Sequence, residues 1–270
     1  MITCKNYVKA ASLQEAWELN QKKSSILIGG MLWVKMGKRT KQTIIDLSDL
    51  GLDTIEETDG EFRIGCMASL RDIETHKGLN DYSQGAVREC VRHIVGVQFR
   101  NTATVGGSIF GRFGFSDVLT QFLAMDSYVE LYKAGVVPMT EFVKMKRDRD
   151  ILVAVIIKKT PGSFAYQSMR NAKTDFPTIA AAVSCMNGKV AASVGARPAL
   201  AMLIPDAEGI MEGVRADGEE ARRDKAAAFG EYVSAHTPTG SNMRGSAEYR
   251  SHLVKVLVKR ACLEMMEDKA

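Results

Sequence analysis

The sequence of 270 residues has no long hydrophobic run, few cysteines and few histidines. No apolar run reaches the roughly 18 residues that a membrane-spanning helix needs. The opening "MITCKNYVKAASLQEAW" lacks the charged-then-apolar layout of a signal peptide, so a cytoplasmic protein without a membrane span is expected. The five cysteines lie far apart, which disfavours a zinc or iron–sulfur site and favours buried thiols. They are Cys4, Cys66, Cys90, Cys185 and Cys262.

The sequence also lacks a cluster of groups suited to acid–base or nucleophilic chemistry. Its four histidines are scattered, so their spacing predicts neither a metal site nor a catalytic dyad. The 36 basic and 32 acidic residues are well mixed and leave a net charge of +4, without the basic block of a nucleic-acid-binding arm. With 46% hydrophobic and 25% charged residues, the chain has the composition of a folded globular protein rather than a disordered one.

Hydrophobic periodicity and turn residues predict a mixture of helices and strands. Ser12 with Glu15 has the form of a capping box, and a helix is therefore expected to open the fold. Strands are expected at 24–28, 43–47, 127–133 and 150–159, with hairpins turning at 59–60 and 187–188. Further helices are expected at 69–76, 84–94, 117–126, 219–233 and 246–268. Because these elements do not alternate strictly, the predicted class is α+β, with a boundary near Pro161-Gly162.

Two short stretches are unusually rich in glycine, "LIGGML" (27–32) and "TATVGGSI" (102–109). Glycine lets backbone N–H groups point together into a concavity and lets a ligand approach without a Cβ in the way. The hydroxyls of Thr104 and Ser108 would add donors in the second stretch. Neither stretch has the spacing of a Rossmann site or of a P-loop. Together they predict a site in which two loops hold one pyrophosphate.

The segments "ILIGGM", "VQFRNTATVGGSI", "SDVLTQFLAMDSYVEL" and "RDILVAVIIKK" resemble, in order and spacing, the FAD-binding subunit of molybdenum-containing hydroxylases. This is the xanthine dehydrogenase and carbon monoxide dehydrogenase flavoprotein family. "SVGARPALA" and "GSNMRGSAEYRSHLVKVLVKRA" are similar to its C-terminal domain, so the resemblance covers the whole chain. It implies a two-lobed FAD-binding domain of the vanillyl-alcohol-oxidase (PCMH) type at 1–160, with lobes at about 1–55 and 56–160. A smaller α+β C-terminal domain would follow at 161–270.

The resemblance also implies roles for individual residues, none of them catalytic and none a metal ligand. The first loop would comprise Ile28, Gly29, Gly30, Met31 and Leu32, and the second Thr104, Val105, Gly106, Gly107 and Ser108. Asp117 matches the acid of an "SD" motif that helps to hold the flavin, Leu152 matches a residue near the flavin ring, and Gln167 stands where relatives can have Lys.

The sequence departs from the family pattern in both loops. Relatives commonly read A-G-G-T-D in the first loop, so Met31 and Leu32 leave only backbone donors there. Ser108 replaces a usual Asn, and Thr120 replaces a usual Pro. These departures are expected to weaken FAD binding rather than to abolish it.

Three functions remain open at this point. By resemblance, the chain is a non-covalent FAD carrier in a hetero-oligomeric molybdenum hydroxylase resembling xanthine dehydrogenase. It would pass electrons from [2Fe-2S] clusters to an acceptor, NAD+, while the clusters and the molybdenum cofactor lie on partner subunits. The alternatives are a self-contained flavoenzyme resembling an enolpyruvyl-sugar reductase and a non-catalytic assembly module.

Two local readings also remain open. Arg100 and Asn101 either brace the second loop or are a solvated arginine beside a turn-forming asparagine. Asp117 either caps a helix beginning at Val118, contacts the flavin, or does both.

Overall fold

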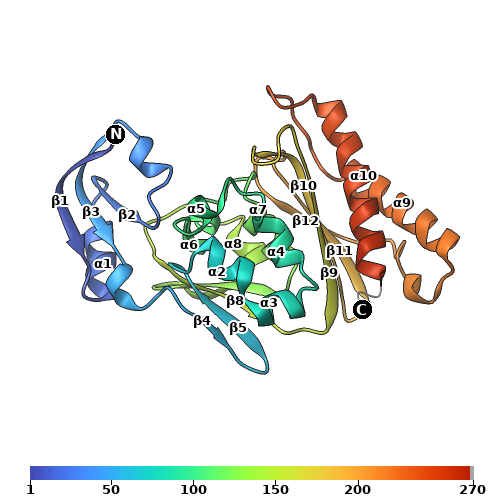
Figure 1. The fold of residues 1–270 in the computed structure, drawn as a ribbon, viewed down its shortest axis with the longest axis horizontal. Helices are drawn as coiled ribbons and strands as arrows, with labels where there is room; N and C mark the ends of the chain where they lie inside the picture. Colours follow the sequence, from blue (N-terminus) through green and yellow to red (C-terminus); the bar gives the residue numbers. More distant parts are fainter. Residues whose placement is uncertain (268–270) are drawn as a thin grey trace.

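A computed structural model describes residues 1–267 as an elongated molecule built on three β-sheets. The N-terminal sheet lies at one end, the central sheet in the middle, and the C-terminal sheet with its long helices at the other end (Figure 1). Asp268, the last residue of the predicted C-terminal helix, lies outside the described residues. In the described part of the chain, no helix is long and apolar enough to cross a membrane.

The N-terminal sheet is parallel, with the strand order β1-β3-β2. Its strands are β1 (Thr3–Lys9), β2 (Ser25–Ile28) and β3 (Thr40–Asp46), and α1 (Leu13–Asn20) packs against β2 and β3. Ser12 caps α1 by accepting a hydrogen bond from the N–H of Glu15, as the sequence predicts. The expectation that a helix opens the fold is wrong, because β1 precedes it. This edge strand is almost wholly exposed, so it shows no hydrophobic alternation.

The central sheet is antiparallel, with the order β4-β5-β8-β6-β7. Its strands are β4 (Ile55–Glu57), β5 (Glu61–Gly65), β6 (Ser127–Leu131), β7 (Gly135–Pro138) and β8 (Leu152–Lys158). Its helices are α2 (Leu70–Thr75), α3 (Lys77–Tyr82), α4 (Ala86–Val91), α5 (Val97–Arg100), α6 (Val105–Ile109), α7 (Asp117–Leu123) and α8 (Met139–Phe142). The predicted hairpin joins β4 to β5, and Ser69 with Asp72 forms a complete capping box on α2.

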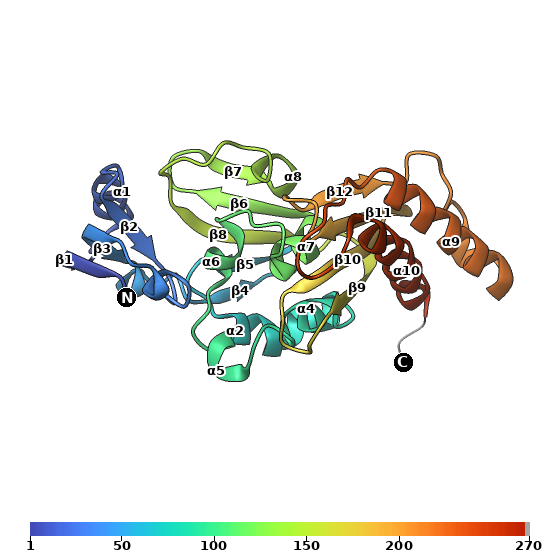
Figure 2. The same ribbon diagram turned by 90° about the horizontal axis from the view of Figure 1, so that it is seen from above.

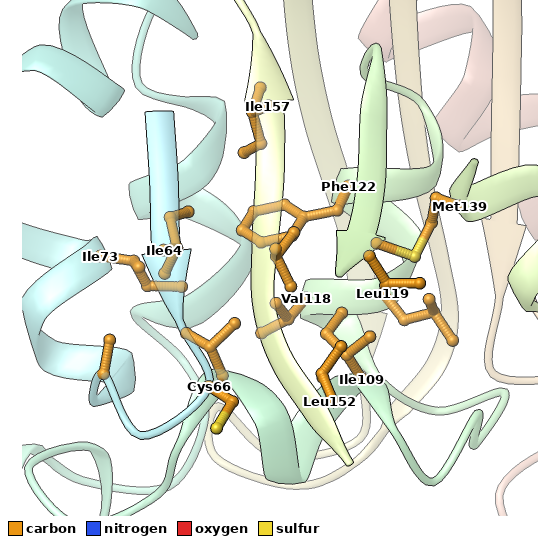
Figure 3. Packing of buried hydrophobic residues seen from close by; sticks show 14 of the residues in the cluster. Ile64, Cys66, Ile73, Ile109, Val118, Leu119, Phe122, Met139, Leu152 and Ile157 are labelled. Atoms are coloured by element: carbon orange, nitrogen blue, oxygen red, sulfur yellow. The ribbon is translucent and has the colours of Figure 1, made fainter. Parts of the chain in front are cut away.

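The main hydrophobic core lies between the central sheet and these helices. Figure 3 shows Val118 and Phe122 of α7 beside β8, which carries Ile157 and Leu152, and Leu119 on the side of Met139. Burial of these side chains is the main force that holds a short helix such as α7 in place, because isolated helices of this length are unstable in water.

The C-terminal sheet has the order β12-β11-β10-β9 and lies between two helical layers. Its strands are β9 (Gly162–Arg170), β10 (Pro177–Met186), β11 (Lys189–Gly195) and β12 (Met202–Pro205). The helix α10 (Ala247–Met266) packs on β9 and β10, and α9 (Glu219–Ala235) packs on α10, as Figures 1 and 2 show. The predicted hairpin turns with positive φ at both Asn187 (49°) and Gly188 (79°), which Asn-Gly tolerates. The 3₁₀ turns are η1 (Val34–Met36), η2 (Ser48–Leu50) and η3 (Val214–Ala216).

The proposed division of the chain at 160/161 falls in the connection between β8 and β9. Side chains of β9, among them Phe164 and Tyr166, belong to the main core, so packing continues across this connection. The proposed lobe limit at 55 falls on the first residue of β4.

Candidate functional site

Two cavities meet where the N-terminal sheet faces the central part of the molecule. The larger has a volume of about 790 Å³ and the smaller about 520 Å³. Four residues line both cavities, namely Leu27, Gly29, Thr104 and Gly107. We call these four residues the neck. They come from the two glycine-rich stretches that the sequence singles out.

The first stretch follows directly after β2 and approaches the second very closely. A Cβ on Gly29 would lie 2.4 Å from Oγ1 of Thr104, and a Cβ on Gly30 would lie 1.8 Å from the carbonyl oxygen of Thr102. Within residues 1–267, the backbone N–H groups of 29–32 have no hydrogen-bond acceptor. Met31 has a φ of 56°, a conformation that favours glycine. The stretch is therefore a turn of free N–H donors that only glycine permits at its closest points.

The second stretch forms the short helix α6 instead of the expected loop. Thr104 caps this helix by accepting a hydrogen bond from the N–H of Gly107 at 3.1 Å, so its own hydroxyl hydrogen remains available. The hydroxyl of Ser108 donates to the carbonyl of Thr104 at 3.1 Å, which occupies the donor that we expected to face a ligand. The N–H groups of Val105 and Gly106 are held by carbonyl oxygens of residues 68 and 66. These tertiary contacts explain why a glycine-rich stretch becomes helical.

Arg100, in the helix just before the second glycine-rich stretch, ties that helix to α2. Its side chain is only 5% exposed, and its Nε lies 2.7 Å from the carboxylate of Glu74 on α2. A further nitrogen donates to the carbonyl of Ile94. Burial raises the pKa of Glu74, but hydrogen bonds from Arg100 and Arg71 outweigh it and hold that pKa below its ordinary value. The reading of Arg100 as a solvated side chain is therefore wrong, whereas the side chain of Asn101 is exposed.

Asp117 lines the larger cavity and belongs to a buried polar cluster with Tyr166 and Arg170. Ser116, and not Asp117, caps α7, because the Ser116 hydroxyl accepts from the N–H of Leu119. The carboxylate of Asp117 accepts hydrogen bonds from the hydroxyl of Tyr166 and from Arg170 at 2.5 Å. Burial raises the pKa of the Asp117 carboxyl above its ordinary value, and the Arg170 charge offsets part of this shift.

Aromatic side chains form much of the wall of the larger cavity. Trp33 packs on Phe176 with ring centres 5.5 Å apart, and Phe115 packs edge-on against Phe176 at 4.8 Å. Phe113 stacks on Phe115 at 5.1 Å. Trp33, Phe113 and Phe115 are exposed by 56%, 46% and 39%, so this wall reaches the surface. The cavity can therefore hold a flat aromatic ligand with one edge near solvent.

The segment that carries Phe176 is fixed from both sides. Arg244, just before α10, forms an ion pair with Asp175 at 2.8 Å and lies over the ring of Phe176. Arg170 holds the same segment by donating to the carbonyl oxygen of Asp175 at 2.7 Å.

The smaller cavity is built differently. Leu152, Cys66 and Phe110 line it together with the charged segment 147–150. Figure 3 shows Leu152 beside Ile109, with Cys66 at the same end of the core. Burial raises the pKa of the Cys66 thiol to about 12, so this thiol is protonated at neutral pH.

The structure gathers most, but not all, of the residues predicted from sequence. Outside the shared neck, the larger cavity is lined by Gly30, Met31, Leu32, Ser108 and Asp117, and the smaller by Ile28, Gly106 and Leu152. Val105 is fully buried beside them. Gln167 lies apart from both cavities, because its side chain donates to Glu264 on α10 at 2.7 Å. Sequence reasoning missed Arg170 and the aromatic wall.

Comparisons with known proteins cover nearly the whole chain. Residues 3–159 match the family described as FAD binding domain in molybdopterin dehydrogenase, and residues 164–265 match the CO dehydrogenase flavoprotein C-terminal domain. The chain is 25% identical to the nicotine 6-hydroxylase medium subunit of Paenarthrobacter nicotinovorans, with 96% of each chain covered.

Two solved structures share the fold. One is the reconstituted CO dehydrogenase from Oligotropha carboxidovorans, with a TM-score of 0.82 and 24% identity over 100% of this chain and 99% of that one. The other is quinoline 2-oxidoreductase from Pseudomonas putida 86, with a TM-score of 0.81 and 19% identity over 98% and 97%. The resemblance inferred from the sequence motifs is thus confirmed, and the α+β fold with it. The chain belongs to the family of FAD-binding domains in molybdopterin dehydrogenases and is an oxidoreductase subunit of the molybdenum hydroxylase type.

Proposed function

We propose that this chain binds one FAD non-covalently, with the pyrophosphate at the neck and one ring system in each cavity. The observation that carries the proposal is that the two cavities share the neck residues Leu27, Gly29, Thr104 and Gly107. A dinucleotide needs a narrow, donor-rich passage between two wider spaces. Three of the four neck residues, Gly29, Thr104 and Gly107, are among those that the sequence motifs predict for the two pyrophosphate loops.

The residues present at the neck fit a pyrophosphate. The N–H groups of 29–32 have no acceptor among the described residues, and the Thr104 hydroxyl retains a free hydrogen. Anionic oxygens bind well to such convergent N–H and O–H donors. Because the glycines bring the two segments within contact distance, the oxygens would meet donors from both sides. The loss of the side-chain hydroxyl at Met31 is thus compatible with binding.

We place the isoalloxazine in the larger cavity and the adenine in the smaller one. The three-ring system needs the greater volume, and the wall of Trp33, Phe115 and Phe176 offers aromatic faces for it. A flavin that exchanges electrons with other proteins also needs an edge near the surface, which this wall provides. Asp117 and Leu152 line different cavities, so only Asp117 would lie beside the flavin ring. Leu152 would then contact the adenine, contrary to the role implied by resemblance.

We further propose that the bound FAD relays electrons within a hetero-oligomeric complex in the cytoplasm. FAD supplies the redox chemistry, since it can accept and release electrons one or two at a time. Iron–sulfur clusters and the molybdenum cofactor would lie on partner subunits, and NAD+ would be the acceptor. Two observations support this: the family match over residues 3–159 and the medium-subunit relative.

Two experiments separate this role from its alternatives. A tagged chain isolated under mild, anaerobic conditions should bring iron–sulfur and molybdenum subunits with it. The chain alone, loaded with FAD, should pass electrons from NADH to a dye but should not oxidise purines or aldehydes. Hydroxylation of xanthine by the chain alone would contradict the subunit role. Rapid NADPH-dependent reduction of an enolpyruvyl sugar would favour a self-contained reductase instead.

A further inference from the structure

The side chain of Arg170 is the most unusual polar group in the larger cavity. Only 7% of this side chain is exposed, and it lies at the start of the segment that carries Phe176. Its Nε is buried and has no hydrogen-bond partner among the described residues. Buried donors in folded proteins nearly always have a partner, and this incompletely paired guanidinium belongs to a residue that lines the cavity, which points to a ligand.

The neighbours of Arg170 occupy two of the five N–H donors of its guanidinium. One terminal nitrogen donates to the carboxylate of Asp117 at 2.5 Å, and the other donates to the carbonyl oxygen of Asp175 at 2.7 Å. Because the guanidinium is planar and rigid, these two bonds fix its orientation, and Nε cannot turn toward another protein acceptor without breaking them. Asp117 is itself held by the hydroxyl of Tyr166. The arrangement is therefore a preorganised donor, and Asp117 and Arg170 both line the cavity.

We propose that Arg170 contacts the cofactor directly, donating a hydrogen bond from its guanidinium to the isoalloxazine and favouring the reduced form of the ring. This inference rests on the proposed function, in which the larger cavity holds the flavin ring. Reduction adds electron density to the pyrimidine side of the ring. A charged donor fixed in a buried position beside the ring stabilises that density more strongly than water does.

The carboxylate next to Arg170 limits how far the arginine can raise the reduction potential of bound FAD. The carboxylate of Asp117 lies against the guanidinium and opposes additional negative charge on the ring. Removing the arginine should thus lower the reduction potential of bound FAD, whereas removing the charge of Asp117 should raise it. Two neighbouring substitutions with opposite effects are not expected from loosening of the site alone.

The test compares Arg170→Gln, Arg170→Lys and Asp117→Asn with a control, Arg63→Gln. Arg63 is a matched control because it also forms a two-nitrogen contact with a carboxylate, that of Glu130, but lines neither cavity. For each protein, FAD stoichiometry and affinity are measured first, and the two-electron potential of the bound FAD is then measured by dye equilibration.

Arg170→Gln should weaken binding of reduced FAD about tenfold more than binding of oxidised FAD, which lowers the two-electron potential by about 30 mV. Arg170→Lys should recover part of this shift, Asp117→Asn should shift the potential upward, and Arg63→Gln should leave it unchanged. If Arg170→Gln binds FAD with the parental potential, the inference about Arg170 is wrong while the proposed function stands. If the parental chain binds no FAD, the proposed function itself is wrong.

Discussion

Replacing Gly30 with alanine tests the close approach of the two glycine-rich stretches. A Cβ at this position would lie 1.8 Å from the carbonyl oxygen of Thr102 and 2.6 Å from its carbonyl carbon. Both are backbone atoms, so no side-chain rotation relieves the contact, and the two stretches must move apart. Overpacking of this kind costs about 1–3 kcal/mol, and a backbone obstacle places Gly30→Ala in the upper half of that range. Because the stretches face each other across the proposed pyrophosphate site, the strain should appear mainly as lost FAD affinity.

A loss of about 2–3 kcal/mol corresponds to FAD binding that is roughly 30- to 150-fold weaker. The assay is a titration of the purified variant with FAD, followed by flavin fluorescence, beside a thermal unfolding measurement. Gly60→Ala is the matched control, because a Cβ there meets nothing within 4 Å and Gly60 has no positive φ. Gly60→Ala should bind FAD like the parent. Binding by Gly30→Ala within about threefold of the parent would refute the assignment of this stretch, since 1 kcal/mol already exceeds that change.

Three further predictions concern the neck, its support and the mode of binding. Gly107→Val should fold but lose FAD, because its methyl groups would fill the neck; Gly107→Ala, whose Cβ lies 3.1 Å from the Thr104 hydroxyl, should retain it. Arg100→Met should lower the free energy of unfolding by about 3 kcal/mol, the lower end for a broken buried ion pair, because Glu74 keeps Arg71 as a partner at 3.0 Å. Because the pKa of Glu74 is lowered in the folded protein, the ion pair stabilises the fold above pH 4.5, the ordinary pKa of Glu, and this stabilisation is lost as the pH falls below that value. The free energy of unfolding of Arg100→Met, measured by chemical denaturation, should therefore fall less steeply with acid than that of the parent. Acid precipitation should release all the flavin; colour retained in the pellet would contradict non-covalent binding.

Local sequence signals predicted much of the fold. The cap of Ser12 on the N–H of Glu15 and the two hairpin turns each depend on a few neighbouring residues, and the structure confirms them. Elements that depend on distant contacts were missed. The strand β1 is almost wholly exposed and therefore lacks a hydrophobic pattern, and α6 is helical because carbonyl oxygens of residues 66 and 68 hold its first turn.

The residues of the candidate site also fall into those that local sequence predicts and those that only the fold brings together. Glycines were visible because their chemistry is local: a turn without Cβ atoms reads directly from the sequence. The pair of Asp117 and Arg170 joins residues that are 53 positions apart, and the aromatic wall combines Trp33, Phe113 and Phe176 from separate segments. No spacing rule links such residues. Gln167 is predicted from the family resemblance alone, and the structure puts its side chain against α10.

The most direct test of the account is a titration of the purified chain with FAD under conditions that keep it monodisperse. Visible absorbance and flavin fluorescence together report how much FAD each chain binds. The account predicts saturation at one FAD per chain, with release of the intact dinucleotide on acid treatment. It also predicts that FMN binds far more weakly, because FMN fills one cavity, brings only one phosphate to the neck and leaves the other cavity without its ligand. A chain that stays colourless at saturating FAD, or that binds FMN as tightly as FAD, would contradict the central claim.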